Sequence, residues 1–143
     1  MKVIVAGSRN IGDHRQIFDA IEESGFNITE LISGCARGVD TIGEFWAAHN
    51  KIPVKRFRAN WRLHKKAAGF IRNAVMADYA DALIAIWDGE SRGTKQMIQC
   101  MWVRNKPVYT KYFKPGLPSG DGAAPTKQSS GVRSSTPAPS SGA

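Results

Sequence analysis

The stretch from Ile32 to Asp40 combines a glycine-rich loop with one cation and one carboxylate. An apolar run ends at Ser33-Gly34, a second glycine follows at Gly38, and an apolar periodic segment begins directly after it. This pattern is typical of a strand, a tight loop and the first turn of a helix. In an α/β fold, such a junction turns backbone N–H groups and the positive end of a helix dipole toward the carboxyl edge of the sheet, where anions bind. Arg37 adds a guanidinium that suits a phosphate, so we expect this loop to bind one.

Two further loops carry the same kinds of group. Gly7-Ser8-Arg9 follows the first apolar run, and residues 88–94 follow the fourth. Each loop taken alone is more typical of an ordinary turn. Loops after parallel strands meet near the switch point of a doubly wound sheet, however, so we expect all three to offer amides, hydroxyls and guanidiniums to one phosphate-bearing ligand. The ligand-binding residues predicted on these loops are Gly7, Ser8, Arg9, Ser33, Gly34, Arg37, Gly38, Asp40, Asp88, Gly89, Ser91, Gly93 and Thr94.

Neither standard phosphate-binding motif is present. Gly7 and Gly12 have the glycine spacing of a Walker A loop, but Asp13-His14 stands where that loop has lysine and serine or threonine. The dinucleotide fingerprint also fails, because no second glycine follows two residues after Gly7 and the second strand ends in Ser-Gly rather than in an acidic residue. We therefore expect a Rossmann-like sheet with neither signature, and no cofactor.

Cysteine and histidine give weaker signals. No sequence feature supplies a base for Cys35, which fits a small loop filler better than a nucleophile. His14, His49 and His64 show no metal-ligand spacing with cysteines or carboxylates, so no metal site is predicted.

The carboxylates leave two interpretations open. Asp40 either stabilises the start of its helix or hydrogen-bonds a ligand ribose or base. Asp88 and Glu90 could do acid–base chemistry, although roles in a turn explain both.

The elements that would position these loops alternate between strands and helices. Apolar runs predict strands over residues 2–6, 28–32, 54–57, 82–87 and 107–110. Helical spacing predicts helices over about 13–25, 39–49, 63–79 and 94–102. In the third of these, an apolar stripe typical of a helix face that packs on a core is formed by Ala67, Phe70, Ile71, Ala74 and Val75. The alternation predicts an α/β fold, with a single Rossmann-like, doubly wound parallel sheet of about five strands and helices on both faces.

The composition separates one domain from a tail. The chain has 143 residues, which is room for one domain with a real core, and we expect that domain to span residues 1–113. Residues 114–143 contain five prolines, five glycines and seven serines, so they cannot bury a core and are predicted to be disordered. The two cysteines are too few for a disulfide framework, and the chain start is too quickly polar for a secretory signal. Without an apolar run of membrane-spanning length, we expect a cytoplasmic protein.

The net charge of +8 is unevenly spread. Residues 51–72, the basic block, hold eight lysines and arginines and no acidic residue. Such a block attracts small phosphates or polyanions, or it is only a solvated surface.

Several of these motifs resemble one family. Gly7-Ser8-Arg9, the run ISGCARGVDTIGEFWA, the pair Arg72-Asn73 within FIRNAVMADYADALIAIWDG, and GESRGT are similar to the SLOG superfamily, and most similar to its YspA-like branch from bacteria and their phages. The resemblance covers about residues 1–110 and leaves out the tail. It implies that Arg72 and Asn73 lie at the rim of the ligand site and that Gly93-Thr94 begins a phosphate-binding helix.

The superfamily offers three functions. Its members include DprA, which binds single-stranded DNA, and the LOG enzymes, which hydrolyse the N-glycosidic bond of nucleoside 5′-monophosphates. The LOG motif PGGxGTxxE places a glutamate three residues after its threonine, whereas this chain has Met97 there and lacks the preceding PGG. Methionine cannot transfer protons, so hydrolysis of the LOG type would need Asp40, Asp88 or Glu90 as a substitute.

The first hypothesis is therefore a module that binds a nucleotide or a nucleotide-derived small molecule, as a sensor or by sequestration. The second is a DprA-like single-strand binder that uses residues 51–72, where Phe57, Trp61 and Phe70 lie among the basic side chains. The third is a nucleotide phosphoribohydrolase with an altered acid. The resemblance also suggests a homo-oligomer.

Overall fold

The two most apolar runs of the sequence become the two central strands of a parallel sheet. In the computed structural model, which describes residues 1–11 and 13–113, the strand order is β3-β2-β1-β4-β5 and every neighbouring pair is parallel. The strands are β1 (Lys2–Gly7), β2 (Glu30–Ser33), β3 (Val54–Arg56), β4 (Ala82–Trp87) and β5 (Val108–Tyr112). The helices are α1 (His14–Glu23), α2 (Val39–His49), α3 (Trp61–His64), the 3₁₀ helix η1 (Lys65–Ala67), α4 (Ala68–Tyr79) and α5 (Arg92–Val103). The predicted five-stranded α/β fold is confirmed.

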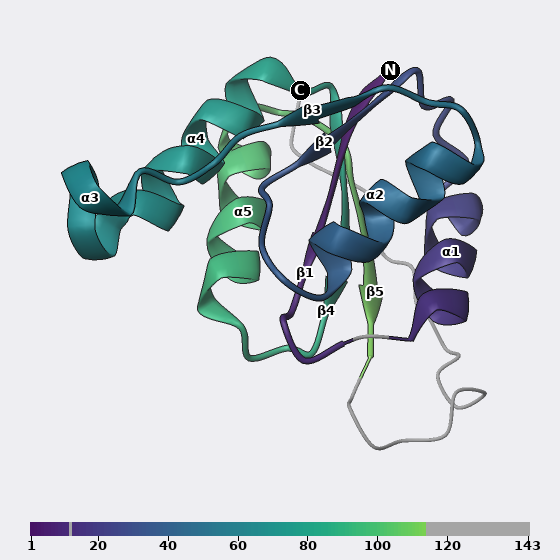
Figure 1. Ribbon diagram of the computed structural model, residues 1–143, viewed down its shortest axis with the longest axis horizontal. Helices are drawn as coiled ribbons and strands as arrows, with labels where there is room; N and C mark the ends of the chain where they lie inside the picture. The colour runs from purple at the N-terminus through teal and green to yellow at the C-terminus, as the bar shows by residue number, and fades with distance from the viewer. Residues whose placement is uncertain (12, 114–143) are drawn as a thin grey trace.

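Helices cover both faces of the sheet, α1 and α2 on one face and α4 and α5 on the other (Figure 1). Alternate residues of β1 therefore enter different cores: Val5 packs with the cluster under α1 and α2, and Ile4 packs with the cluster under α4 and α5. β4 is buried on both faces in the same way, since Ile84 belongs to the first cluster and Leu83 to the second. This double burial explains why both strands read as nearly unbroken apolar runs.

The strand order places the switch point between β1 and β4. From β1 the chain moves outward to β2 and β3, and then crosses to β4 on the other side of β1. The carboxyl ends of β2, β1 and β4 are therefore neighbours, at the lower edge of the sheet in Figure 1. The three loops singled out by the sequence all begin at this edge.

The expected single helix over 63–79 is wrong. The chain forms α3, the short η1 and then α4, with a break at Lys65, whose φ of +55° is left-handed. α3 projects away from the sheet (Figure 1).

The predicted apolar stripe is also not the buried face of α4. Phe70, Ile71 and Val75 are 48%, 40% and 47% exposed, whereas the buried residues include Asn73 and Met76. The buried residues of α4 are Ala68, Asn73, Met76 and Ala77, which form a different face from the one that the apolar spacing favours.

Two expectations fall outside the described residues, namely the disordered tail over 114–143 and any role of Gly12. Within the described part of the chain, no helix combines the length and the apolar character needed to cross a bilayer.

Candidate functional site

The loops after β1 and β4 are joined at the carboxyl edge of the sheet by Ser8. Its backbone N–H donates to the Ile86 carbonyl at 3.1 Å, and its side-chain hydroxyl accepts from the Asp88 N–H at 3.1 Å. Ser8 is buried, with 1% of its surface exposed. Gly7 permits the approach, because a Cβ at that position would lie 2.2 Å from the Ile86 carbonyl oxygen. Two loops that are far apart in the sequence therefore form one rigid unit.

The loop after β2 touches the loop after β1 through backbone atoms. Gly38 has a φ of +76°, and a Cβ there would lie 2.7 Å from the carbonyl oxygen of Arg9. A side chain at this position would meet both a conformational penalty and a clash. All three predicted loops are thus in direct or indirect contact, as the sheet topology requires.

Inside the loop after β2, the buried carboxylate of Asp40 binds the loop's own backbone. Its Oδ2 accepts from the Gly34 N–H at 3.0 Å and from the Ala36 N–H at 3.3 Å. Burial raises the pKa of Asp40 to about 6, although the Ala36 and Gly34 amides and the charge of Arg72 act in the opposite direction. Asp40 therefore has a structural role in the loop and also lies in the first turn of α2. Whether it also contacts a ligand stays a prediction.

α4 supplies the cross-links between the second and third loops. The Arg72 guanidinium donates through Nη1 to the Gly34 carbonyl and through Nε to Asn73 Oδ1, the latter at 3.0 Å. Asn73 in turn donates through Nδ2 to the Gly93 carbonyl at 3.3 Å and to Gln96 Oε1 at 2.8 Å. Burial lowers the pKa of Arg72, and the negative charge of Asp40 opposes that shift. Arg72 and Asn73 thus contact the loops after β2 and β4, and their place at the rim of a ligand site stays a prediction.

The loop after β4 is shaped by its own side chains. Asp88 Oδ1 accepts from the N–H groups of Glu90 and Ser91, both at 2.8 Å. Burial alone would raise the pKa of Asp88, but these hydrogen bonds outweigh it and the pKa is lowered. Ser91 caps α5 by accepting from the Thr94 N–H at 3.3 Å, and Gly89 has a φ of +85°. Gly93 is exposed, and a Cβ there would meet nothing within 4 Å.

Two arginines at this edge keep their charge available. Arg9 and Arg37 are exposed, and the side chain of neither forms a hydrogen bond or an ion pair with a described residue. Of the predicted residues, these two offer an anion a whole guanidinium that no described residue occupies.

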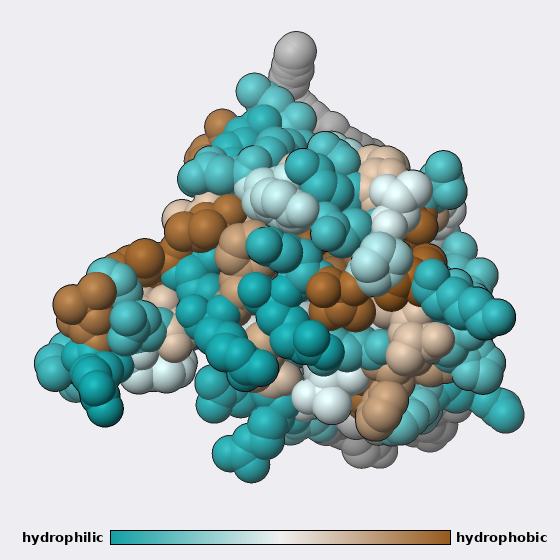
Figure 2. Space-filling model, turned by 45° about the horizontal axis from the view of Figure 1, so that its top comes forward, coloured by the Kyte–Doolittle hydropathy of each residue, from teal (hydrophilic) through white to brown (hydrophobic). Residues whose placement is uncertain are grey.

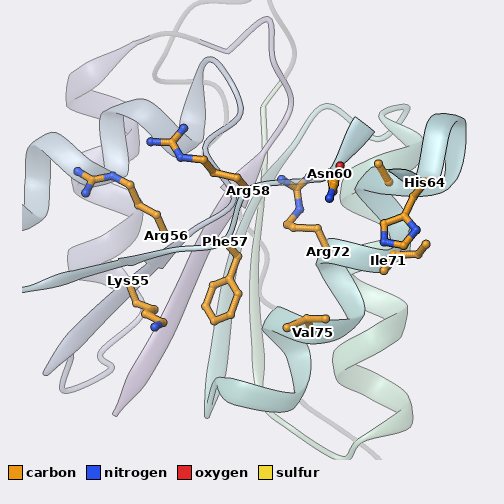
Figure 3. A pocket seen from close by; sticks show the side chains of 10 residues that line it. Lys55, Arg56, Phe57, Arg58, Asn60, His64, Ile71, Arg72 and Val75 are labelled. Carbon is orange, nitrogen blue, oxygen red and sulfur yellow. The ribbon is translucent and has the colours of Figure 1, made fainter. Parts of the chain in front are cut away.

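A pocket of about 390 Å³ opens beside the Gly34 loop, between the segment that follows β3 and the helix α4 (Figure 3). Four cationic side chains line it: Lys55, Arg56, Arg58 and Arg72. The remaining lining residues are Phe57, Asn60, His64, Ala68, Ile71 and Val75. This volume lies within the range of about 300–1,000 Å³ that is usual for small-molecule sites.

The four cations differ in how far they are already neutralised. Arg56 is paired with Glu44 at 2.9 Å, and Lys55 lies over the ring of Phe57, with Nζ 5.7 Å from its centroid. Arg58, in contrast, is exposed and has no hydrogen-bonding or ion-pair partner among residues 1–11 and 13–113. No carboxylate lines the pocket. The pocket therefore favours an anionic ligand.

Sequence reasoning missed this pocket as a small-molecule site. The basic block indicates small phosphates, polyanions or only a solvated surface, and its sequence does not predict an enclosed pocket. Asn60 and His64 line the pocket together with Ala68 at the start of α4, because the chain breaks at Lys65 between α3 and α4. No residue pattern in the sequence predicts that break.

Two of the weaker candidates lie within these features, Cys35 in the loop after β2 and His64 in the lining of the pocket. Cys35 and Cys100 are both free thiols, and the described residues contain no group of three His, Cys, Asp or Glu side chains placed to hold a metal ion. Met97, at the position of the LOG glutamate, is 1% exposed and packs in the core under α4 and α5. A side chain at this position would face the core rather than a ligand.

Comparisons with known proteins agree with the fold. The sequence model of the YspA, cpYpsA-related SLOG family matches residues 1–64. The Gene 61 protein of Mycobacterium phage D29 is 32% identical over 125 residues, which is 80% of this chain and 98% of that protein.

Two solved structures of DNA processing protein A have a similar fold. The protein from Streptococcus pneumoniae superimposes with a TM-score of 0.62 at 17% identity over 76% of this chain. The match spans only about half (49%) of the length of that protein. The protein from Helicobacter pylori, whose structure was described for its single-stranded DNA binding mode, superimposes with a TM-score of 0.62 at 18% identity, over 81% of this chain and 67% of that one.

Proposed function

Because the chain belongs to the YspA, cpYpsA-related SLOG family, we propose that it binds a nucleotide or a nucleotide-derived small molecule at the carboxyl edge of its sheet, as a sensor or by sequestration. The observation that supports this most directly is the joining of three loops beside a basic pocket. Ser8, Gly38 and Arg72 connect the loops, and exposed arginines surround them.

The distribution of charge favours a phosphate-bearing ligand over a neutral one. Arg9, Arg37 and Arg58 have exposed guanidiniums without a carboxylate partner in the described chain. A guanidinium and a phosphate form a charge-assisted, often bidentate pair, which is stronger than a bond between neutral groups.

The internal contacts of the loops suggest where the phosphate binds. The Gly34 and Ala36 amides, the donors expected from the sequence, are already used by Asp40. A phosphate would therefore interact with the arginine side chains and with the exposed surface of Gly93 at the start of α5.

Isothermal titration against a panel of nucleotides, with an Arg37→Ala variant, tests the proposal. The variant should fold normally, because Arg37 is exposed, and it should weaken binding about ten-fold or more. Arg104→Ala is the matched control, because Arg104 follows α5 at the opposite edge of the sheet. Failure of the folded wild-type protein to bind any member of the panel would contradict the proposal, and so would an equal loss in both variants.

A second candidate function is binding of single-stranded DNA. The observation that favours it is Trp61, which is 54% exposed on the projecting helix α3, next to Arg62 and followed by Lys65 and Lys66. Figure 2 shows apolar and hydrophilic side chains side by side on the projecting part of this surface. Exposed aromatic rings among cations suit stacked bases and a phosphate backbone.

Anisotropy titrations of a labelled oligothymidylate would test this second function. Affinity should fall steeply with salt, and Arg62→Glu should weaken binding much more than Arg15→Glu, which makes the same charge change on α1, outside residues 51–72. Equal effects of the two substitutions would reduce the basic block to a surface that promotes solubility.

A further inference from the structure

The pocket beside β3 has two chemically different walls. Phe57 and Val75 form an apolar wall, and Asn60 and Arg72 form a polar one. In Figure 3, Phe57 and Val75 lie on one side of the space, and Arg72 and Asn60 lie on the other. An inorganic phosphate or a small phosphorylated sugar would use only the polar wall.

The side chain of Asn60 has a fixed orientation. Its Oδ1 caps α3 by accepting from the Leu63 N–H at 3.0 Å, so its amide nitrogen is turned toward the pocket (Figure 3). That nitrogen makes no hydrogen bond with the described residues. The pocket therefore offers two N–H donors beside an apolar surface.

Arg72 sets the direction in which an anionic ligand would lie. Its Nη1 is held by the Gly34 carbonyl, and the guanidinium thus stands between the pocket and the three loops. Arg58 lines the same pocket and is exposed. Negative charge is favoured at this end, whereas the apolar side chain of Val75 lies further along α4.

We propose that this pocket holds the base of a nucleotide whose phosphate extends past Arg72 to the arginines and the Gly93 surface at the carboxyl edge of the sheet. The inference rests on the proposed function and specifies the ligand as one with an aromatic base. A nucleobase has apolar faces and a polar edge, which match Phe57 and Val75 on one side and the Asn60 amide on the other. Without a base, the apolar wall would stay exposed to water.

Filling the pocket separates the contribution of the base from that of the phosphate. Val75 is 47% exposed and belongs to neither core cluster, so Val75→Trp should be tolerated while its indole occupies the space for the base. Val103→Trp is the matched control, since Val103 is 75% exposed at the end of α5 and does not line the pocket. The probes are the four ribonucleoside 5′-monophosphates and ribose 5-phosphate, measured by isothermal titration.

We expect Val75→Trp to weaken binding of the best nucleoside monophosphate about ten-fold and to leave the affinity for ribose 5-phosphate unchanged. Val103→Trp should change neither affinity. Asn60→Ser keeps a capping side chain but removes the amide donors, so it should reduce the preference among the four bases. If nucleotides bind the wild-type protein but Val75→Trp has no effect, or weakens both kinds of probe equally, the base pocket is refuted and the proposed function stands. If neither kind of probe binds the wild-type protein, both fail.

Discussion

The buried carboxylate of Asp40 predicts an unusual dependence of stability on pH. Its pKa is about 6 in the folded protein and 3.8 in an unfolded chain. Between these pH values the folded protein holds more protons than the unfolded one, so the free energy of unfolding should fall as the pH rises and level off above 6. The difference of about 2.2 pKa units corresponds to about 3 kcal/mol, of which about 2 kcal/mol is lost between pH 4.5 and 7.

Asp40→Asn isolates this contribution. Asparagine keeps an oxygen that can accept from the Gly34 and Ala36 amides, but it carries no charge and does not titrate. Relative to the wild-type protein, the variant should therefore become more stable by about 2 kcal/mol between pH 4.5 and 7. Urea unfolding followed by circular dichroism at several pH values measures the difference.

The difference in stability between the wild-type protein and Asp40→Asn cancels the contributions of the other titrating groups. Asp78 and Asp88 have lowered pKa values, so their stabilising effect is lost only as the pH falls below the range used here, and equally in both proteins. Asp19→Asn, which removes an exposed carboxylate from α1, is the control and should reproduce the wild-type profile. A stability difference between the wild-type protein and Asp40→Asn that stays constant from pH 4.5 to 7 would refute the reasoning.

Two further predictions concern the loop contacts. Gly7→Ala should destabilise the protein by about 3 kcal/mol, because the new Cβ would lie 2.2 Å from the Ile86 carbonyl oxygen. Gly89→Ala should cost only about 1 kcal/mol, since alanine is strained at its positive φ but the space around it is open. Urea unfolding of both variants checks the order, and equal losses would contradict it. Ser8→Ala should cost about 1–3 kcal/mol by leaving the Asp88 N–H without its acceptor, and faster amide exchange at Asp88 would accompany that loss.

The fold could be predicted from sequence because its determinants are local. The run Ala82–Trp87 is apolar without interruption, as a strand buried on both faces must be. The first strand, which contains Val3 and Val5, has the same character. Right-handed crossovers and short connections then leave few ways to order the strands, and the order observed here brings the loops after β1 and β4 together.

The details of the site depend on contacts between residues far apart in sequence. The partners of Asp40 lie four and six residues before it, and nothing in that spacing separates an internal hydrogen bond from a ligand contact. The contact between Arg72 and Gly34 joins residues that are 38 positions apart.

The sequence also did not predict which face of α4 is buried. Phe70, Ile71 and Val75 have the spacing of a buried stripe, yet they are exposed because α4 turns the face that carries Asn73 and Met76 toward the core.

The carboxylate of Asp40 has a consequence for the kinetics of binding. A phosphate-binding loop without an internal anion must often become ordered when its ligand arrives, and that loss of conformational entropy weakens the affinity. Here Asp40 and Arg72 already fix the backbone at Gly34. The entropy of ordering has been lost during folding, so the anionic ligand that we propose would meet an ordered loop, and we expect it to associate at the rate of electrostatically guided diffusion.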